Sequence, residues 1–469
     1  MRAALVSAGA GASAGADAGS IVLVHTADPS LYSPARLVAL AAAVDDLRQR
    51  TQGRVVSLLG EPSIVLPPLV KDLEAVRVVV QRAFEPTVAQ RQEALSEALQ
   101  PLGAQLELHG GAYAVDPGTI VSGAKTPYKV FTPFSKAWKV AAASNVAASA
   151  TAEGAAEQIA QSLSSALLDS ESLYCDNPLA PLAEKAAEDL PPATLSAARG
   201  INETEAWRRW SEFVADGLTG YETDRDRPDF DGTSRMSAQL AFGTIHPSAL
   251  LADISSRVET RTLTAENADK FISELAWREF YADQLFHRPE VATDNADRRF
   301  DHYRWHESES DLSDWRNGVT GFPIVDAGMR QLAQTGWMHN RVRMIVASFL
   351  VKDLHLRWQD GAKVFRQRLL DYSPASNQLS WQWCAGSGFD ASPFFRVFNP
   401  ARQGRKFDPH GDYVRHWVPE LAEVPGAKVH DIPDNPGMRP PSYPAPMVHH
   451  DSERKEALRR FEQVKGFER

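Results

Sequence analysis

Cysteine is scarce in this sequence, and its scarcity excludes two kinds of architecture. Only 2 of the 469 residues are cysteines, and neither Cys175 nor Cys384 has metal-ligand spacing around it. A disulfide framework and a structural zinc site are therefore not expected, and no metal is predicted. Such sparing use of cysteine favours a reducing compartment, so we expect the protein to be cytoplasmic.

Long apolar runs are absent as well. The longest covers residues 345–351, far short of the roughly 18–20 apolar residues that a membrane helix needs. The first twenty residues carry one basic residue, Arg2, and their apolar stretch at 3–6 is too short for a signal peptide. We expect no membrane partner and interpret these twenty residues as a flexible or partly helical lead-in.

The chain also lacks an excess of basic charge. Its 50 Lys and Arg stand against 60 Asp and Glu, which gives a formal net charge of −10. This excludes a basic coat over the whole surface, although a local basic patch stays open. No GxGxxG or Walker motif is found, so no nucleotide is indicated by a glycine-rich loop.

Three regions differ in composition. Residues 1–135 alternate β-branched runs with helical segments, which predicts a Rossmann-like α/β domain with a parallel sheet. Residues 136–200 are rich in Ala, Ser and Glu and are interpreted as a connector. Residues 201–469 are predicted to be helical, and ten of the eleven tryptophans lie there. In the first region we expect strands at 21–29, 55–60, 76–84 and 104–110, and helices at 37–50, 65–73 and 87–101.

Residues 229–243, DFDGTSRMSAQLAFG, combine a turn with the start of a helix. The hydroxyl groups of Thr233 and Ser234, with free backbone N–H groups, could hold a phosphate there. Simple N-capping explains the same pattern, and the pattern alone favours capping.

Residues 271–286 predict a long helix with aromatic and acidic side chains on one face. Phe271, Glu274, Trp277 and Tyr281 follow one another at spacings of three, three and four. Such a face could stack on and hydrogen-bond a planar ligand. A core stripe with Glu274 at its edge is the simpler alternative, and spacing alone favours it.

Residues 336–358 predict a buried helix that carries charge. Asn340, Arg343 and Met344 share one face, and a buried arginine needs a carboxylate or phosphate partner. Asp371, at the end of the following helical segment, could supply the carboxylate. His339 has no metal-ligand neighbour at the right spacing, so we expect a structural histidine.

Residues 373–408 hold two tryptophans, Trp381 and Trp383, and then a basic stretch. Over 390–408, four Arg and Lys residues face two Asp residues, which leaves a net charge of +2. This would suit contact with a nucleic-acid backbone. A solvated basic loop is the alternative that charge alone favours.

Taken together, these segments resemble the DNA photolyase/cryptochrome family. The resemblance rests on TSRMSAQLAFG, SELAWREFY, GFPIVDAGMRQLAQTGWMHNRVRM, SWQWCAGSGFDASPFFRVFNP and QGRKFD, in this order. It is greatest to class I cyclobutane pyrimidine dimer photolyases, and it covers residues 100–469 well and 20–100 loosely. It implies a large all-α FAD-binding domain after the α/β domain. It further implies a monomer that repairs UV-damaged DNA when photoexcited reduced FAD gives an electron to a flipped-out dimer.

The resemblance also implies which residues hold the cofactor. The FAD phosphates and ribityl chain would be bound by Tyr221, Thr233, Ser234, Arg235, Met236 and Ser237. The flavin ring would be surrounded by Phe271, Arg343, Asp371, Tyr372, Ser373 and Asn377. Within this set, Arg343 would pair with Asp371, and Asn377 would face flavin N5. The family's electron path maps onto Trp381, then Trp358, then Trp305 towards the surface.

Substrate contacts are implied in the same way. Glu274 and Asn340 would hydrogen-bond the dimer and, with Asn377, would be the catalytic residues. Trp277 and Trp383 would stack on the flipped-out bases, and Met344 would close the pocket. The DNA strand would be touched by Arg225, Arg341 and Gln403. Asn rather than His at position 340 points to cyclobutane dimers and away from (6-4) photoproducts.

The N-terminus departs from the family pattern. The first strand and the following loop of the type FRRDLR are not recognisable, and MRAAL is expected to enter where the family has its first helix. We therefore expect a shortened sheet and favour a mis-assigned start codon. An antenna chromophore, which is 8-hydroxy-deazaflavin or methenyltetrahydrofolate in relatives, receives little support from a shortened sheet.

Two rival functions stay open on the sequence. A cryptochrome-like blue-light photoreceptor would use the same tryptophans but would need no dimer pocket. The presence of Glu274, Trp277, Asn340 and Trp383 argues for repair instead. An inactive flavoprotein with an incomplete sheet is the third possibility, and poor flavin retention would support it.

Overall fold

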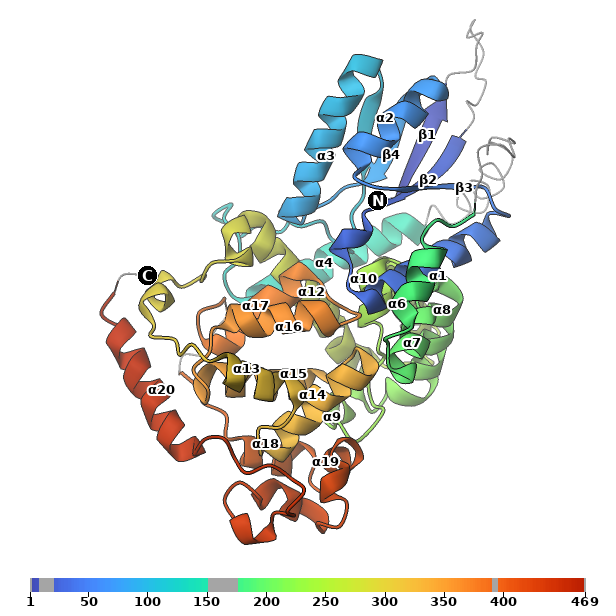
Figure 1. Cartoon of the computed structure of the whole chain (residues 1–469). Helices are drawn as coiled ribbons and strands as arrows, with labels where there is room; N and C mark the ends of the chain where they lie inside the picture. The colour runs from blue at the N-terminus through green and yellow to red at the C-terminus, as the bar shows by residue number, and fades with distance from the viewer. Residues whose placement is uncertain (1, 8–20, 151–175, 390–394, 468–469) are drawn as a thin grey trace, which may run out of the picture.

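The structure is a computed structural model in which a small α/β domain lies above a larger helical domain (Figure 1). It describes residues 2–7, 21–150, 176–389 and 395–467. The part of the predicted connector at 151–175, the lead-in at 8–20 and Asp390 lie outside these residues. Among the helices described, none is both long and apolar enough to cross a membrane.

Five strands form one sheet in the order β3-β2-β1-β4-β5. The bounds of the strands are β1 Arg2–Ser7, β2 Ile21–Ala27, β3 Val55–Leu59, β4 Ala75–Gln81 and β5 Gln105–His109. β2 pairs with β3 and β4 pairs with β5 in parallel, as predicted. The four predicted strands are thus confirmed to within a few residues.

The expectation that the sheet lacks its first strand is wrong. β1 fills the central position and runs antiparallel to both neighbours, with Arg2 opposite His25 and Ala3 opposite Val80. An inner position offers hydrogen bonds on both edges, and these outweigh the weak β-propensity of an alanine-rich segment. Local propensity gave no sign of this strand, because its stabilising partners are distant in sequence.

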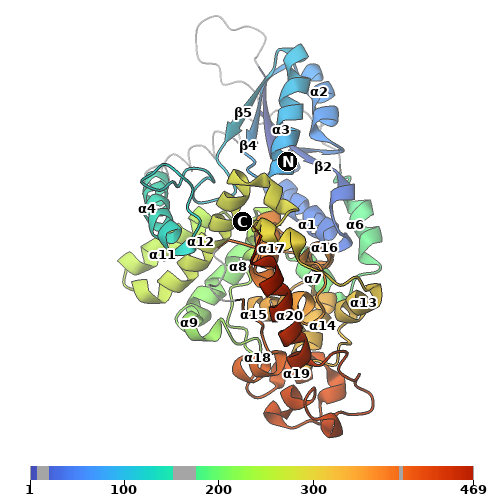
Figure 2. The same cartoon turned by 90° about the vertical axis from the view of Figure 1, so that its left-hand side faces the viewer.

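Among the described residues, helices cover one face of the sheet. α2 (Pro62–Asp72) and α3 (Pro86–Leu99) pack on that face, where Val78 and Leu95 belong to one buried cluster (Figure 2). α1 (Pro34–Arg50) lies instead between the sheet and the helical domain. On the opposite face, Arg77 and Glu107 form an ion pair with 3.5 Å between nitrogen and oxygen. This opposite face therefore carries charged side chains at β4 and β5.

Helices α4, α6 and α7 follow the sheet and lead into the helical domain. Their bounds are Phe131–Ala150, Ala180–Ala187 and Pro192–Arg199, and α6 and α7 pack against α1. The predicted domain boundary between residues 135 and 136 falls inside α4. This boundary was drawn from composition, which does not report where a helix starts.

Among the described residues, the helical domain contains thirteen further α-helices and one π-helix. Their bounds are α8 Glu203–Glu212, the π-helix η4 Phe213–Gly217, α9 Tyr221–Asp224, α10 Ser237–Phe242, α11 Pro247–Glu259, α12 Ala265–His287, α13 Glu309–Asn317, α14 Pro323–Thr335, α15 Asn340–Lys352, α16 Trp358–Arg368, α17 Pro374–Ala385, α18 Pro400–Phe407, α19 Asp412–Trp417 and α20 His450–Val464. Short 3₁₀ turns lie at Pro29–Leu31, Gln100–Leu102, Pro289–Ala292, Arg298–His302, Pro419–Leu421, Gly426–Asp431 and Pro436–Met438.

Proline explains where many of these helices begin. α11, α14, α17 and α18 each start with proline, whose fixed φ suits the first helical turn and whose missing N–H is not needed there. The apolar faces of the helices form two buried clusters, a large one among α13 to α17 and a second among α4, α8, α11 and α12. Packing within these clusters fixes the positions of the helices that surround the candidate site.

The segment between the sheet and α4 is held to α12 by buried carboxylates. Glu279 accepts hydrogen bonds from the Ala114 backbone N–H at 2.6 Å and from the Trp138 indole N–H at 2.6 Å. Asp283 accepts one from the Gly118 N–H at 2.8 Å. α12 is therefore fastened to the connecting segment along its C-terminal half.

Candidate active site in the helical domain

A cavity of about 520 Å³ opens among α12, α15, α17 and the turn that joins α16 to α17. Its lining brings together thirteen of the residues predicted from the sequence. They are Arg225, Glu274, Trp277, Asn340, Arg341, Arg343, Met344, Asp371, Tyr372, Ser373, Asn377, Trp381 and Trp383. No described residue of the α/β domain contributes to this wall.

An ion pair lies at the base of the cavity wall. Arg343 donates to both carboxylate oxygens of Asp371, at 3.1 and 2.8 Å, and its Nε donates to the Met338 carbonyl at 2.7 Å. The Ser237 hydroxyl donates to the same carboxylate at 2.6 Å. Asp371 has only 2% of its side chain exposed, so this bidentate pairing supplies the compensation that a buried charge requires.

The remaining predicted cofactor residues do not line the cavity. Tyr221 and Phe271 are buried in the aromatic core, with ring centres 5.7 Å apart. Thr233, Ser234, Arg235 and Met236 lie outside the wall, in the turn that leads into α10. Arg235 has a left-handed φ of 53° and its guanidinium lies 4.5 Å from the centre of the Trp337 ring. The hydrogen bond from Ser237 to Asp371 ties this turn to the cavity.

The cavity wall fits a flavin in its chemistry. The amide of Asn377 donates to the Ala362 carbonyl at 3.1 Å, which fixes that side chain in the wall. The indole N–H of Trp381 is buried and has no hydrogen-bond partner among the described residues. A planar, partly polar ring bordered by Arg343 and Asp371 could accept a hydrogen bond from the Trp381 N–H and would contact Asn377. These residues would hold the isoalloxazine of FAD.

On α12, two predicted substrate residues face the same cavity. Trp277 stacks on Phe131 of α4, with ring centres 3.7 Å apart and planes 8° from parallel. One face of the indole is thereby covered by protein. Glu274 forms a hydrogen-bonded ion pair with Arg225 and a second pair with Lys270 at 3.6 Å.

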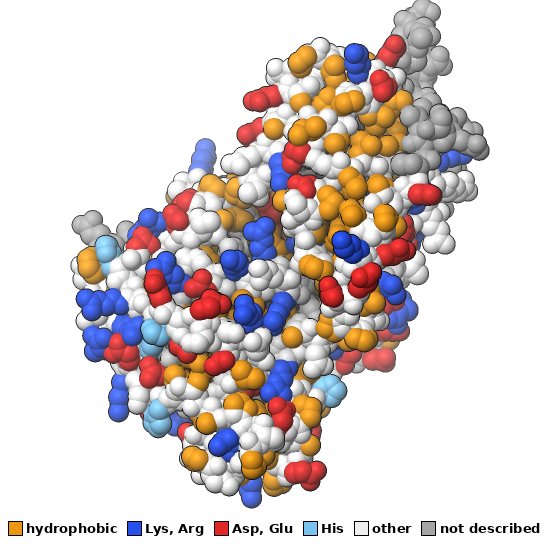
Figure 3. Space-filling model, in the orientation of Figure 1, with side chains coloured by type: hydrophobic (Ala, Val, Ile, Leu, Met, Phe, Trp, Pro, Cys, Tyr) orange, Lys and Arg blue, Asp and Glu red, His pale blue; other side chains and the backbone are white. Residues whose placement is uncertain are grey.

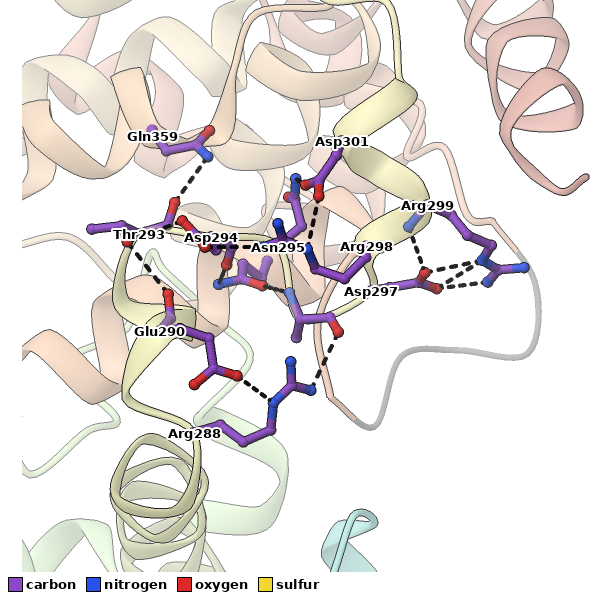
Figure 4. A network of polar contacts seen from close by, with 12 residues as sticks. Arg288, Glu290, Thr293, Asp294, Asn295, Asp297, Arg298, Arg299, Asp301 and Gln359 are labelled. Atoms are coloured by element: carbon purple, nitrogen blue, oxygen red, sulfur yellow. Dashed lines mark hydrogen bonds and ion pairs between the residues drawn. The ribbon is translucent and has the colours of Figure 1, made fainter. Parts of the chain in front are cut away.

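The predicted electron path crosses the contact between α16 and α17. The Trp381 ring packs against the backbone of Gly361, where a Cβ atom would lie 2.2 Å from the ring. Trp358 is fully buried one turn earlier in α16, and its indole N–H donates to Asn295 at 2.9 Å. Asn295 is held in turn by Asp301 in the polar network of Figure 4. Trp305 is half-buried, so it is the outermost of the three predicted tryptophans.

Gln403 of α18 lies at a separate cavity of about 640 Å³, lined also by Arg396, Arg402 and Arg454. Arg396 borders both this cavity and the main one. On the face seen in Figure 3, acidic and basic side chains are intermingled, and hydrophobic side chains gather over the sheet domain. The basic side chains at the cavity beside Gln403 thus form a local patch.

Sequence reasoning missed several residues of the main cavity. Lys270 precedes Glu274 by one helical turn, so the i, i+4 spacing could have identified it. Cys384 and Phe365 gave no signal, since their place depends on helix packing. Burial raises the pKa of the Cys384 thiol to about 12, so the thiol stays protonated. His339 caps α15 through Nδ1, and burial lowers its pKa to about 4, as suits a structural histidine.

A cavity of about 300 Å³ lies where β2, β3 and β4 end, lined by Tyr32, Glu85 and Arg91 among others. In parallel α/β sheets, ligands bind at this edge. Because β1 completes the sheet, the argument against an antenna chromophore based on a missing strand no longer holds.

This fold and cavity define a two-domain flavoprotein with an arginine–aspartate pair and tryptophans in its core. A family described as the FAD binding domain of DNA photolyase matches residues 271–463, and one described as DNA photolyase matches residues 3–153. The chain belongs to the DNA photolyase/cryptochrome family, and its helical domain is an FAD-binding domain.

Named relatives cover most of the chain. A deoxyribodipyrimidine photo-lyase of Agrobacterium fabrum is 37% identical over 439 residues, which is 90% of this chain and 87% of the relative. One of Halobacterium salinarum is 35% identical, covering 97% and 94%. The crystal structure of a bacterial class III photolyase from Agrobacterium tumefaciens superposes with a TM-score of 0.80 at 33% identity, covering 95% and 92%. The class I resemblance of the motifs therefore stays a prediction.

Proposed function

We propose that the protein is a deoxyribodipyrimidine photo-lyase that uses light to repair cyclobutane pyrimidine dimers in DNA. One observation carries this proposal: all but one of the residues expected around the flavin ring line the same cavity as those expected around the dimer. In that cavity the flavin would lie beside Asp371 and Asn377, and the damaged base beside Glu274 and Asn340. A photoreceptor that acts by flavin reduction alone needs no residues that contact a dimer.

The chain's own residues would bind and orient the damaged base. Trp277 and Trp383 provide ring faces for stacking, which is worth roughly 1–3 kcal/mol per base. Glu274 and Asn340 would hydrogen-bond the polar edge of the dimer, and the hydrogen bonds donated to its carbonyl oxygens would favour the extra negative charge that develops there. Arg225, Arg341 and Gln403 would contact the phosphate backbone.

FAD, when bound and reduced, supplies an electron on absorbing light, and the electron returns after the two ring bonds open. Arg343, Asp371 and Asn377 would hold the cofactor in the cavity and exclude water from one side. Trp381, Trp358 and Trp305 would conduct an electron inward from the surface to keep the cofactor reduced.

The test uses purified protein, a thymine-dimer oligonucleotide and reducing anaerobic conditions, with blue light and a dark control. Light-dependent return of intact thymines is expected. Glu274→Gln should lower the repair yield, while Glu266→Gln on the exposed first turn of the same helix should leave it unchanged. If the bound FAD is photoreduced but no dimer is repaired, the proposal is wrong and the photoreceptor function takes its place.

A further inference from the structure

Five charged side chains of alternating sign form a row beside the main cavity. In spatial order they are Lys270, Glu274, Arg225, Asp226 and Arg341. Glu274 pairs with Lys270 at 3.6 Å and with Arg225. Asp226 Oδ1 lies 3.9 Å from Arg225 Nε and 2.7 Å from Arg341 Nη2. Each inner group therefore has an opposite charge on both sides.

Asp226 differs from the other four members of the row. They line the cavity, whereas Asp226 does not; its Oδ1 lies 2.7 Å from Arg341 Nη2 and 3.9 Å from Arg225 Nε, and 37% of its side chain is exposed. Arg341 is further fixed by Phe407, whose ring centre lies 4.4 Å from the guanidinium carbon. Asp226 is thus a counter-ion shared between the two side chains that face the DNA in the proposed function.

The row has consequences for how a flipped-out base can be held. Glu274 is occupied by Arg225, and only 13% of the Arg225 side chain is exposed. If Glu274 turned to a base, Arg225 would lose its closest carboxylate, and a poorly hydrated charge without a partner is costly. Asp226 is the neighbouring carboxylate that can replace Glu274. By moving towards Arg225 it would release Arg341 for a phosphate.

We propose that Asp226 is a positioning residue that sets the discrimination between damaged and undamaged DNA, by passing from Arg341 to Arg225 when Glu274 engages a flipped-out base. On undamaged DNA, Glu274 stays with Arg225 and Asp226 stays with Arg341, so a phosphate must compete for Arg341. Specificity is a difference of affinities, and here an opposing contact weakens the wrong complex. The inference rests on the proposed function.

Binding in the dark tests this on the FAD-loaded full chain, with one duplex that holds a single thymine dimer and the same duplex undamaged. Asp226→Asn should bind the undamaged duplex more tightly, because Arg341 is released. It should bind the damaged duplex more weakly, because Arg225 then retains Glu274. The ratio of the two affinities should fall by about fivefold, the upper range for one partly exposed ion pair.

Glu222→Gln is the matched control. It removes one negative charge four residues earlier, from helix α9, which precedes the turn that carries Asp226; Glu222 is exposed and forms no ion pair with any residue in the described parts of the chain. Its affinity ratio should equal that of the unmodified protein. If Asp226→Asn strengthens binding to both duplexes by the same factor, Asp226 acts only through local charge and the inference is wrong.

A second measurement needs no variant. In the unmodified protein, the salt dependence of binding should be steeper for the damaged duplex by about one phosphate contact, a slope difference of roughly 0.9. Equal slopes would overturn the inference even if Asp226→Asn failed to fold. If the unmodified protein neither repairs nor prefers the dimer, the proposed function itself fails, and this outcome is distinct from an unchanged ratio in Asp226→Asn.

Discussion

Gly361→Ala offers a direct test of how Trp381 is seated. A Cβ atom at position 361 would lie 2.2 Å from Trp381 Cη2 and 2.6 Å from Leu350 Cδ2. Ordinary carbon contacts are about 3.5 Å, so the ring or α16 must shift by about 1.3 Å. Overpacking of this kind costs about 1–3 kcal/mol. The gain from replacing a helical glycine by alanine offsets about 1 kcal/mol of that.

We therefore expect Gly361→Ala to lower the free energy of unfolding by up to about 2 kcal/mol. The displaced indole should also change the rate of light-driven FAD reduction. Urea unfolding and flavin absorbance after a light pulse measure the two effects. Gly437→Ala is the control, because its Cβ would have no atom within 4 Å. Unfolding free energy within about 0.5 kcal/mol of the unmodified protein, together with an unchanged photoreduction rate, would refute the packing of Trp381 against α16.

Three further predictions concern buried charges. Burial raises the pKa of Glu279 from 4.5 to about 7. Between these two pH values the folded state keeps a proton that the unfolded state loses. The free energy of unfolding should therefore fall by on the order of 3 kcal/mol as the pH rises from 4.5 to about 7. In Glu279→Gln, the unfolding free energy measured with urea should lack this dependence on pH. The same dependence in both proteins would contradict the prediction. Arg343→Met leaves Asp371 with Ser237 alone and should cost about 2 kcal/mol and weaken FAD retention, with partial rescue in Arg343→Lys; equal flavin content in Arg343→Met would count against the pair. Tyr443→Phe removes a hydroxyl donor from the buried Asp326 carboxylate and should cost about 1–2 kcal/mol, and an unchanged thermal midpoint would show that the bond contributes nothing.

Local patterns were sufficient for much of the fold and of the cavity. The period of α12 placed Glu274 and Trp277 on one face, and the need of a buried arginine for a partner indicated Asp371. Both arguments depend on spacing or on a single residue's chemistry. Strand alternation located four strands for the same reason.

Features that depend on distant pairing were not predictable in this way. The position and direction of β1 follow from two ladders with partners far along the chain. The stack of Phe131 on Trp277 joins residues from different helices, and nothing in either local sequence indicates it. The shared role of Asp226 between two arginines likewise appears only once the turn after α9 lies beside the start of α15.

The attachment of α12 to the connecting segment bears on which parts of the sequence can vary. The same helix presents Glu274 and Trp277 to the cavity and holds the connecting segment through Glu279 and Asp283. This attachment fixes α12 and so orients the side chains that the helix contributes to the cavity. Since no described wall residue comes from the sheet, the sequence of the sheet domain can vary without replacing any side chain of the cavity wall.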